Sequence, residues 1–261
     1  MEQDIKRMGR VLGARKILTL FLATLSMVVI WGAGESAQAA SPTLALAIGS
    51  PGSGNGQFSA PTGVTGDPSG NVWVADTENG RIQEFNSEGE YLSQVATGGD
   101  PWGVAIDPAG NIWVSNLAND QVEEFNPKGE LVRHFGTPGS GNGQFDVPTG
   151  IAVDPSGDLW VADTGNNRVQ EFNPKGEYLG KFGTSGSGNG QLYSPTDVAV
   201  DPSGDLWVTD YGNNRVQEFN PKGEYLAKFG TSGSGNGQFR NPRSLAIDSS
   251  GDLWVTDYGN N

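Results

Sequence analysis

The sequence lacks cysteine altogether and has a single histidine, His134, among its 261 residues. A chain without cysteine can form no disulfide bond, and it cannot bind zinc through thiolate ligands. This excludes disulfide-stapled small domains and cysteine-ligated zinc modules. The fold must therefore be stabilised by noncovalent packing.

Basic residues are scarce. The chain has 16 Lys and Arg against 30 Asp and Glu, which gives a formal net charge of −14 at pH 7. An acidic surface repels the phosphate backbone of nucleic acids and the surface of anionic membranes. We therefore expect no nucleic-acid partner, and we interpret the negative charge chiefly as a contribution to solubility.

The sequence also lacks a long hydrophobic run. The longest apolar stretch, Ile17–Trp31, has fifteen residues, whereas a membrane-spanning helix needs about 20. It follows a basic segment and precedes Ala37-Gln38-Ala39, a pattern typical of a secretory signal peptide. We predict cleavage between Ala39 and Ala40, with an uncleaved N-terminal membrane anchor as the alternative.

This prediction divides the chain into a signal segment, residues 1–39, and a mature segment, residues 40–261. It places the protein outside the cytoplasm, secreted or in the cell envelope. Cleavage removes five basic and three acidic residues, which leaves 11 basic and 27 acidic residues and a net charge of −16. Contact with a membrane is then expected only if the N-terminal segment stays attached.

One motif is repeated through the rest of the chain. The segment Asp154–Leu179 recurs almost unchanged as Asp201–Leu226, and more divergent copies begin at Asp67, Asp107 and Asp248. The starts are 40, 47, 47 and 47 residues apart. Internal similarity at a fixed period of this size is the signature of repeat architectures such as solenoids and propellers.

Each copy has the pattern of four short strands joined by turns. In the third copy, alternating or β-branched runs occupy Gly150–Asp154, Leu159–Asp163, Arg168–Asn173 and Tyr178–Phe182. The 40 glycines and 15 prolines recur between these runs, where turns require them. Four antiparallel strands in a unit of this length predict an all-β fold, a β-propeller with about four and a half blades present.

Tryptophan recurs at one place in the predicted second strand of every copy. We predict that these side chains pack between adjacent blades, because they supply much of the large apolar volume. A ladder of aromatic residues for ligand binding is the alternative. The positions are Trp73, Trp113, Trp160, Trp207 and Trp254.

An acidic and a basic residue flank the second turn of three copies. The second copy has Asn116 and Gln121 at these positions, so both charges are absent together. Their joint absence predicts a contact, and we expect structural ion pairs rather than catalytic groups. The pairs are Asp76 with Arg81, Asp163 with Arg168, and Asp210 with Arg215.

These motifs resemble NHL repeats. The resemblance rests on four matching stretches of the third copy and on the glycine-rich loop that precedes a copy. The stretches are Pro148–Asp154, Gly157–Asp163, Asn166–Phe172 and Gly176; the loops are Gly52–Phe58, Gly139–Phe145, Gly186–Leu192 and Gly233–Phe239. The resemblance implies a propeller that has six blades when complete.

Five copies, the last one partial, are fewer than six blades require. We expect a C-terminally truncated propeller that lacks roughly 50–60 residues, by the repeat length. Leu44–Ile48 is similar to the last strand of a copy. We predict that it closes the propeller by joining a blade formed at the other end of the chain.

The glycine-rich loops and the second turns should share one end of the blades. That end is rich in Gly, Ser, Asn and Gln, whose side chains suit adaptable hydrogen bonding to a ligand. We predict binding by Asn166, Asn167, Asn213 and Asn214. The alternative is that these residues only form turns.

Other candidate chemistry is weaker. Asp154, Ser156 and Asp158 resemble half of a calcium loop but lack its bidentate glutamate, so hairpin turns are favoured. The glycine loops lack the lysine of a phosphate-binding loop. His134 lies in the last strand of the second copy, where the third and fourth copies have Lys181 and Lys228. This favours a solvated side chain.

We predict an exported, non-catalytic binding module for a protein or a cell-envelope glycan, without a cofactor and without a bound metal. We favour a protein that is not an enzyme, because its acidic residues repeat from copy to copy. A catalytic site needs a set of residues that occurs once, and the sequence shows no such set. One alternative is a metal-dependent propeller lyase or lactonase-type hydrolase, as the resemblance allows. Another is an extracytoplasmic sensor domain anchored by the N-terminal segment.

Overall fold

The protein is described by a computed structural model, which defines residues 18–20, 28–30, 46–248 and 251–260. The chain forms two compact units, residues 23–151 and residues 152–261 together with 1–22. The predicted signal segment and its cleavage site at Ala39 lie outside the described residues, apart from two short strands. Among the residues that are described, no helix has the length and hydrophobicity needed to cross a membrane.

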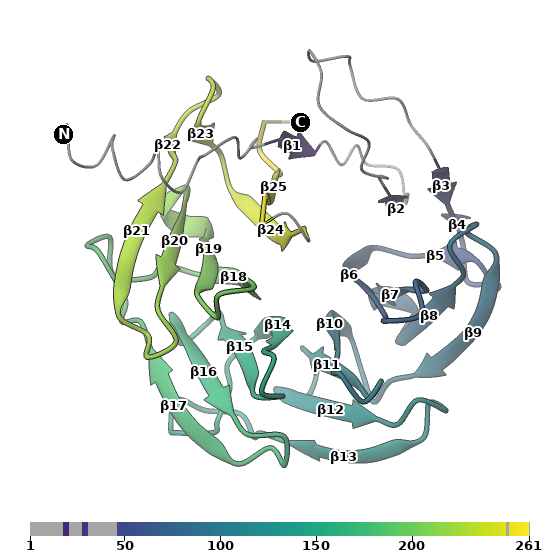
Figure 1. Cartoon of the computed structure of the whole chain (residues 1–261). Helices are drawn as coiled ribbons and strands as arrows, with labels where there is room; N and C mark the ends of the chain where they lie inside the picture. Colours follow the sequence, from purple (N-terminus) through teal and green to yellow (C-terminus); the bar gives the residue numbers. More distant parts are fainter. Residues whose placement is uncertain (1–17, 21–27, 31–45, 249–250, 261) are drawn as a thin grey trace. The chain divides into compact units, whose positions relative to one another are not determined.

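Four complete blades confirm the predicted fold class (Figure 1). Each blade is a four-stranded antiparallel sheet whose strands follow one another in chain order. The strands are β6 (Pro61–Gly66), β7 (Val72–Asp76), β8 (Arg81–Phe85) and β9 (Tyr91–Ala96); β10 (Pro101–Ile106), β11 (Ile112–Asn116), β12 (Gln121–Phe125) and β13 (Leu131–Phe135); β14 (Pro148–Val153), β15 (Leu159–Asp163), β16 (Arg168–Phe172) and β17 (Tyr178–Phe182); and β18 (Pro195–Val200), β19 (Leu206–Asp210), β20 (Arg215–Phe219) and β21 (Tyr225–Phe229).

The remaining elements are short. A fifth, partial blade contains β24 (Pro242–Ile247) and β25 (Leu253–Asp257), and β1 (Leu18–Leu20) pairs with β25 in parallel. Further pairs join β2 (Val28–Ile30) to β3 (Leu46–Ile48), β4 (Ser50–Pro51) to β5 (Gln57–Phe58), and β22 (Thr231–Ser232) to β23 (Gln238–Phe239). Two single-turn 3₁₀ helices, η1 (Thr77–Asn79) and η2 (Tyr211–Asn213), follow β7 and β19.

Turn residues and strand patterning fix the register within each blade. In the fourth blade, β19 and β20 pair without a bulge from Leu206↔Phe219 to Asp210↔Arg215. A slip by one residue would turn every apolar side chain to the wrong face. The register therefore places the acidic and basic residues of the second turn opposite each other at the ends of the two strands.

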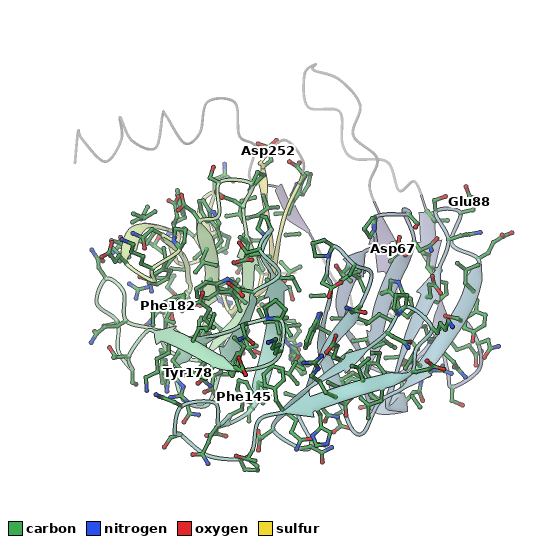
Figure 2. The ribbon with its side chains drawn as sticks, turned by 60° about the horizontal axis from the view of Figure 1, so that its bottom comes forward. Asp67, Glu88, Phe145, Tyr178, Phe182 and Asp252 are labelled. Carbon is green, nitrogen blue, oxygen red and sulfur yellow. The ribbon has the colours of Figure 1, made fainter. Side chains whose placement is uncertain are left out.

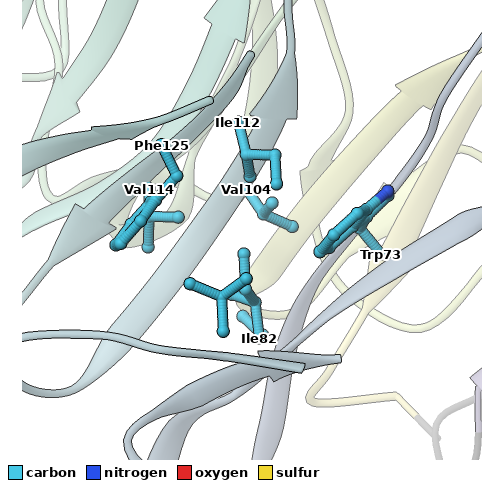
Figure 3. Close-up of a cluster of buried hydrophobic side chains, with 8 residues drawn as sticks. Trp73, Ile82, Val104, Ile112, Val114 and Phe125 are labelled. Atoms are coloured by element: carbon cyan, nitrogen blue, oxygen red, sulfur yellow. The ribbon is translucent and has the colours of Figure 1, made fainter. Parts of the chain in front are cut away.

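Three of the five recurring tryptophans lie between blades, as predicted. Trp73 of β7 lies in a buried cluster with Val104, Ile112 and Phe125 of the following blade (Figure 3). Trp160 and Trp207 join equivalent clusters with the first two strands of the fourth and fifth blades. Because the first, third and fourth blades each bury the second-strand tryptophan against the following blade, none of these three completes its core alone.

Strand β3 occupies the place of a fourth strand next to the first blade. A Cβ atom on Gly49, directly after β3, would contact the ring of Phe58, just as one on Gly230 would contact Phe239. A Cβ atom on Gly89 would lie 3.0 Å from Cγ1 of Ile48. The corresponding Gly223 of the fourth blade faces Phe182, which lies with Tyr178 on the fourth strand β17 (Figure 2).

These contacts agree with the fourth-strand character predicted for Leu44–Ile48, of which residues 46–48 form the observed strand. Within the described residues, β3 pairs with β2. Its pairing with a blade from the other end of the chain stays a prediction.

Candidate functional site

The structure contains the three predicted ion pairs at the ends of the second and third strands. All three are almost completely buried, and each joins an arginine Nε atom to an aspartate Oδ2 atom. The separations are 2.7 Å for Arg81 and Asp76, 2.7 Å for Arg168 and Asp163, and 2.6 Å for Arg215 and Asp210.

The aspartate of each pair is hydrogen-bonded on both oxygens. In the fourth blade, Oδ1 of Asp210 accepts from the backbone N–H of Tyr193 at 2.7 Å, and Oδ2 accepts from Nε2 of Gln217 at 3.0 Å. Asn213 donates to both oxygens through Nδ2 at 2.9 Å. Complete hydrogen bonding offsets the cost of desolvating the carboxylate.

In the first and fourth blades, the arginine of the pair holds the glycine-rich loop of its own blade. The two Nη atoms of Arg215 donate to the carbonyl oxygens of Ser187 at 2.9 Å, Gly188 at 2.8 Å and Gln191 at 2.9 Å. In the first blade, Arg81 Nη2 donates to Gly54 O and Gln57 O at 2.8 and 2.9 Å. The pairs are therefore anchors for the loops as well as links between strands.

The glycine-rich loops carry exposed, uncharged polar side chains at their tips. Ser53 and Asn55 are exposed in the first loop, and Ser234 and Asn236 in the loop before β24. Gln57 folds back to accept a hydrogen bond from Gly54 N at 3.0 Å, and Gln238 does the same with Gly235 N at 2.9 Å. The same small polar surface is thus displayed repeatedly on rigid backbone.

The four asparagines predicted to bind a ligand are used within the chain. Asn166 Nδ2 donates to both oxygens of Asp163 at 3.0 Å, in the same role as Asn213. Asn167 and Asn214 adopt positive φ values of 55° and 54°, a conformation that asparagine tolerates in turns. Their Oδ1 atoms accept from Ser194 N at 2.8 Å and Asn241 N at 2.7 Å. A binding role for them stays a prediction, and their structural role is evident.

The second blade combines three departures from its sisters. Asn116 and Gln121 replace the ion pair, and the long glycine loop is reduced to Thr97–Asp100. Glu123 stands where the sister blades have glutamine, and Asn116 Nδ2 donates to its Oε1 atom at 3.2 Å. Amide and carboxylate have exchanged places, and the loop-holding arginine is absent together with the loop.

Glu123 is buried without an arginine partner. Burial raises its pKa, and hydrogen bonds from Gly98 N at 3.0 Å and from Asn116 partly oppose this effect. His134 pairs opposite Glu123 in the β12–β13 register, and its charge also lowers the pKa of the carboxyl. His134 is exposed, which agrees with the solvated side chain expected from the sequence.

Asp197 is a functional candidate that the repeat pattern concealed. It is the third residue of β18, where β6 and β10 have Gly63 and Gly103. A Cβ atom on Gly63 would contact Trp102 O and lie 3.1 Å from Gly103 Cα, so the first strands of these blades leave no room for a side chain. The sequence signal was the motif Pro-Thr-Asp in place of Pro-Thr-Gly.

The carboxyl group of Asp197 connects two blades. Oδ2 accepts from the backbone N–H of Leu245 in β24 at 2.9 Å, and Oδ1 accepts from Val198 N at 2.9 Å. Desolvation by burial outweighs these hydrogen bonds and raises the pKa of Asp197 to about 7. A carboxyl group that titrates near neutral pH is suited to proton transfer.

Next to Asp197 lies a surface that we call the Tyr/Arg patch, formed by Tyr193, Arg240, Arg243 and Tyr258. The guanidinium carbon of Arg243 lies 5.0 Å from the ring centroid of Tyr258, a cation–π contact. Thr196 Oγ1 donates to Arg243 O at 2.7 Å, which ties β18 to β24 beside Asp197. Tyr193 and Tyr258 are 53% and 54% exposed.

The acidic turns at the other ends of the strands are closed by local hydrogen bonds. Asp154 Oδ1 accepts from Ser156 N at 2.8 Å and from Asp158 N at 3.0 Å, which is the hairpin turn favoured over calcium binding. Burial raises the pKa of Asp158, and the charge of Asp154 adds to the effect. Within the described ranges, no three His, Asp or Glu side chains are placed to hold a metal ion.

Blade architecture and comparison with known proteins together define the molecule. Its four-stranded antiparallel blades are those of a β-propeller. The repeats are NHL repeats: the NHL repeat family matches residues 58–85, 145–172, 192–219 and 239–261, so this is an NHL-repeat propeller protein. Among curated proteins, none matches the sequence.

Solved structures with the same fold include a streptogramin B lyase and a virginiamycin B lyase. A streptogramin B lyase superposes with a TM-score of 0.61 at 17% identity over 77% of this chain and 63% of its own. Virginiamycin B lyase from Staphylococcus aureus superposes with a TM-score of 0.57 at 18% identity, over 76% of this chain and 63% of its own. A catalytically inactive variant of that lyase with quinupristin superposes with a TM-score of 0.57 at 18% identity, over 77% of this chain and 78% of its own. The likeness shows the fold alone, and the chain spans 63% of the length of the first two structures.

Proposed function

We propose that the protein is an exported, non-catalytic binding module whose glycine-rich loops hold a cell-envelope glycan, with an extracytoplasmic protein as the other ligand that these loops suit. The observation that carries this proposal is the anchoring of the loops. In the fourth blade, Arg215 and Gln217 together fix the carbonyls of Ser187, Gly188 and Gln191.

Rigid anchoring favours binding because a preorganised loop loses little conformational entropy when a ligand arrives. The exposed serine and asparagine side chains offer hydroxyl and amide groups that can both donate and accept hydrogen bonds. Repetition of one small polar surface suits a ligand that is itself repetitive, as a polysaccharide is. Multiple weak contacts then add through effective concentration.

Retention on immobilised polysaccharides tests this proposal. We would compare the protein with Asn55→Ala/Asn236→Ala, which removes two exposed loop side chains, on columns of peptidoglycan, chitin, cellulose and polygalacturonate. The matched control is Lys222→Ala, an exposed residue of the turn between β20 and β21 at the opposite strand ends. We expect retention on at least one column, a several-fold reduction in the double variant, and no change in the control. Equal retention of all three proteins would contradict loop-mediated binding.

A second candidate function is that of a propeller lyase or hydrolase, and Asp197 is the specific observation in its favour. It is singular among the first strands, and its pKa of about 7 suits a general base. The fold likeness to lyases agrees with this candidate. Incubation with quinupristin, followed by chromatography and mass spectrometry, tests it. Conversion that Asp197→Asn abolishes would support it, and unchanged quinupristin would contradict this substrate choice.

A further inference from the structure

Departures from the repeat are concentrated at one end of the fourth and fifth blades. Repeats provide an internal reference, because sister residues in the same structural position show what the fold alone requires. Compared with the first and third blades, Tyr193 and Arg240 stand at the position of Ser59 and Asp146, and Arg243 at that of Thr62 and Thr149. Tyr258, like Tyr211 of the fourth blade, stands at the position of Thr77 and Thr164. Small polar residues are replaced by large aromatic or cationic ones, and the fold does not need these replacements.

These substituted residues form one continuous surface through a chain of contacts. Gly212 N donates to Tyr193 O at 2.8 Å, and Asn214 Oδ1 from the same turn accepts from Asn241 N at 2.7 Å. Arg240, the neighbour of Asn241, accepts through its carbonyl from Gly259 N at 2.7 Å. Tyr193 and Arg240 therefore flank the two sides of the turn 211–214.

Arg243 and Tyr258 complete this surface. The contact between the Arg243 guanidinium and the Tyr258 ring places a cation against an exposed aromatic face. The hydrogen bond from Thr196 to Arg243 O keeps the start of β24 beside β18. The Tyr/Arg patch thus belongs to the loop end of the blades. Asn260, two residues after Tyr258, donates through Nδ2 to Gly233 O at 2.7 Å, which ties this end to the loop that carries the exposed Ser234 and Asn236.

We propose that the Tyr/Arg patch binds an acidic sugar, a uronate residue of a polysaccharide. This inference rests on the proposed binding function and names the ligand class. Tyrosine rings offer flat apolar faces for the C–H face of a sugar ring and hydroxyl groups for its polar edge. Arginine presents a planar fork of N–H donors that matches a carboxylate in a bidentate pair.

The charge of the patch favours an acidic sugar over a nucleic acid. The chain as a whole is acidic, with a net charge of −14, so its cationic surface is limited. The two arginines of the patch, Arg240 and Arg243, suffice to neutralise the single carboxylate of a uronate. A nucleic acid carries a far denser row of phosphates and would require an extended basic surface. The neighbouring serine and asparagine side chains supply uncharged partners for sugar hydroxyls. The ligand is therefore a polyhydroxylated carboxylate.

Isothermal titration calorimetry with a galacturonic acid tetramer tests the proposal, with a neutral galactose tetramer as the matched probe. The variants are Arg243→Thr and Tyr193→Ser, which restore residues found in the sister blades and so preserve the fold. Lys222→Ala is the control. We expect binding of the acidic tetramer only, weakened at least tenfold by each variant and reduced by added salt. Arg243→Lys retains the charge without the fork and should lose affinity as well.

The outcomes separate this inference from the proposed function. Equal affinity for the two tetramers, or unchanged affinity in Arg243→Thr, would overturn the acidic-sugar site while leaving a glycan-binding module in place. No binding of either tetramer would also overturn it, and the polysaccharide columns would then decide about the function. Binding of the acidic tetramer with the expected losses in both variants would establish the patch as the site.

Discussion

At the scale of single residues, the buried Asp–Arg pair links the blade to its loop. A buried ion pair gains little net stability when its desolvation cost is large, but removal of one partner leaves an uncompensated charge. Here the arginine also donates hydrogen bonds to two loop carbonyls, which ties the loop to the blade. The second blade agrees with this linkage, because it lacks both the ion pair and the long loop that the arginine would hold.

This arrangement predicts strong coupling between Asp210 and Arg215. Arg215→Gln alone should cost about 3–5 kcal/mol of the free energy of unfolding, since Asp210 remains buried and charged. Asp210→Asn/Arg215→Gln recreates the neutral pair of the second blade and should cost clearly less than the sum of the two single variants. Urea unfolding of all four proteins measures the coupling. Additive effects would contradict the buried pair.

Asp197 predicts a dependence of stability on pH. Its pKa in the folded protein, about 7, lies above the ordinary aspartate value of 3.8, so between these values the folded state keeps a proton that the unfolded state has lost. Stability must therefore fall as the pH rises from about 4 to about 7. At about 1.4 kcal/mol per pKa unit, and with Asp197 only partly buried, we expect a loss of about 2–4 kcal/mol.

The variants Asp197→Asn, which cannot titrate, and Asp197→Gly, which restores the sister residue, isolate this effect. The stability difference between the parent protein and each variant should change over pH 4–7 and level off above it. Urea midpoints at several pH values measure the difference. A difference that stays constant across this range would show that Asp197 does not titrate as described.

At the scale of secondary-structure elements, local chemistry made the blades predictable. Alternating residues and Pro-Ser-Gly or Pro-Lys-Gly turns predicted both ends of β15 and β17 as the structure has them. The predicted third strand ends one residue after β16 does. The ion pairs were predictable because the second copy lost both charges at once. In such a repeat, one copy serves as the control for another.

Contacts between blades were not predictable from the repeat. Asp197 was overlooked because its role depends on Leu245 N of the next blade, a partner 48 residues away. The side-chain partners of the asparagines could not be foreseen for the same reason: Asn214 Oδ1 accepts from Asn241 N of the following loop. Turn propensity identified their backbone conformation, whereas the partners of their side chains are set by tertiary packing.

Strand β3 gives a prediction about an element outside the complete blades. Ile48 lies in a buried cluster with Phe58, Val74 and Phe85, so the strand packs on the first blade as a fourth strand would. Ile48→Ala should therefore cost about 2–4 kcal/mol through lost burial and the cavity left behind. Leu46→Ala, at the partly buried edge of the cluster, should cost less. Thermal unfolding of both variants measures this order, and an unaffected Ile48→Ala protein would contradict it.

At the scale of the whole molecule, the export that we propose would depend on the first 39 residues, which carry five of the 16 basic residues. A helix formed by Ile17–Trp31 would be about 22 Å long, at 1.5 Å per residue, which is shorter than the hydrocarbon core of about 30 Å. The mismatch favours a cleaved signal over a stable anchor, although snorkelling basic residues reduce its cost. The two fates differ in mass, in location and in net charge.

Expression of the full chain in a secreting bacterial host, followed by intact-mass measurement of the exported protein, decides between them. Cleavage between Ala39 and Ala40 should yield a soluble product that begins at Ala40 and carries a net charge of −16. Replacement of the small residue by Ala39→Trp should block processing and retain the protein in the membrane fraction, because the cleavage site requires small side chains. A parent protein that keeps residues 1–39 and sediments with membranes would instead establish the anchored sensor form.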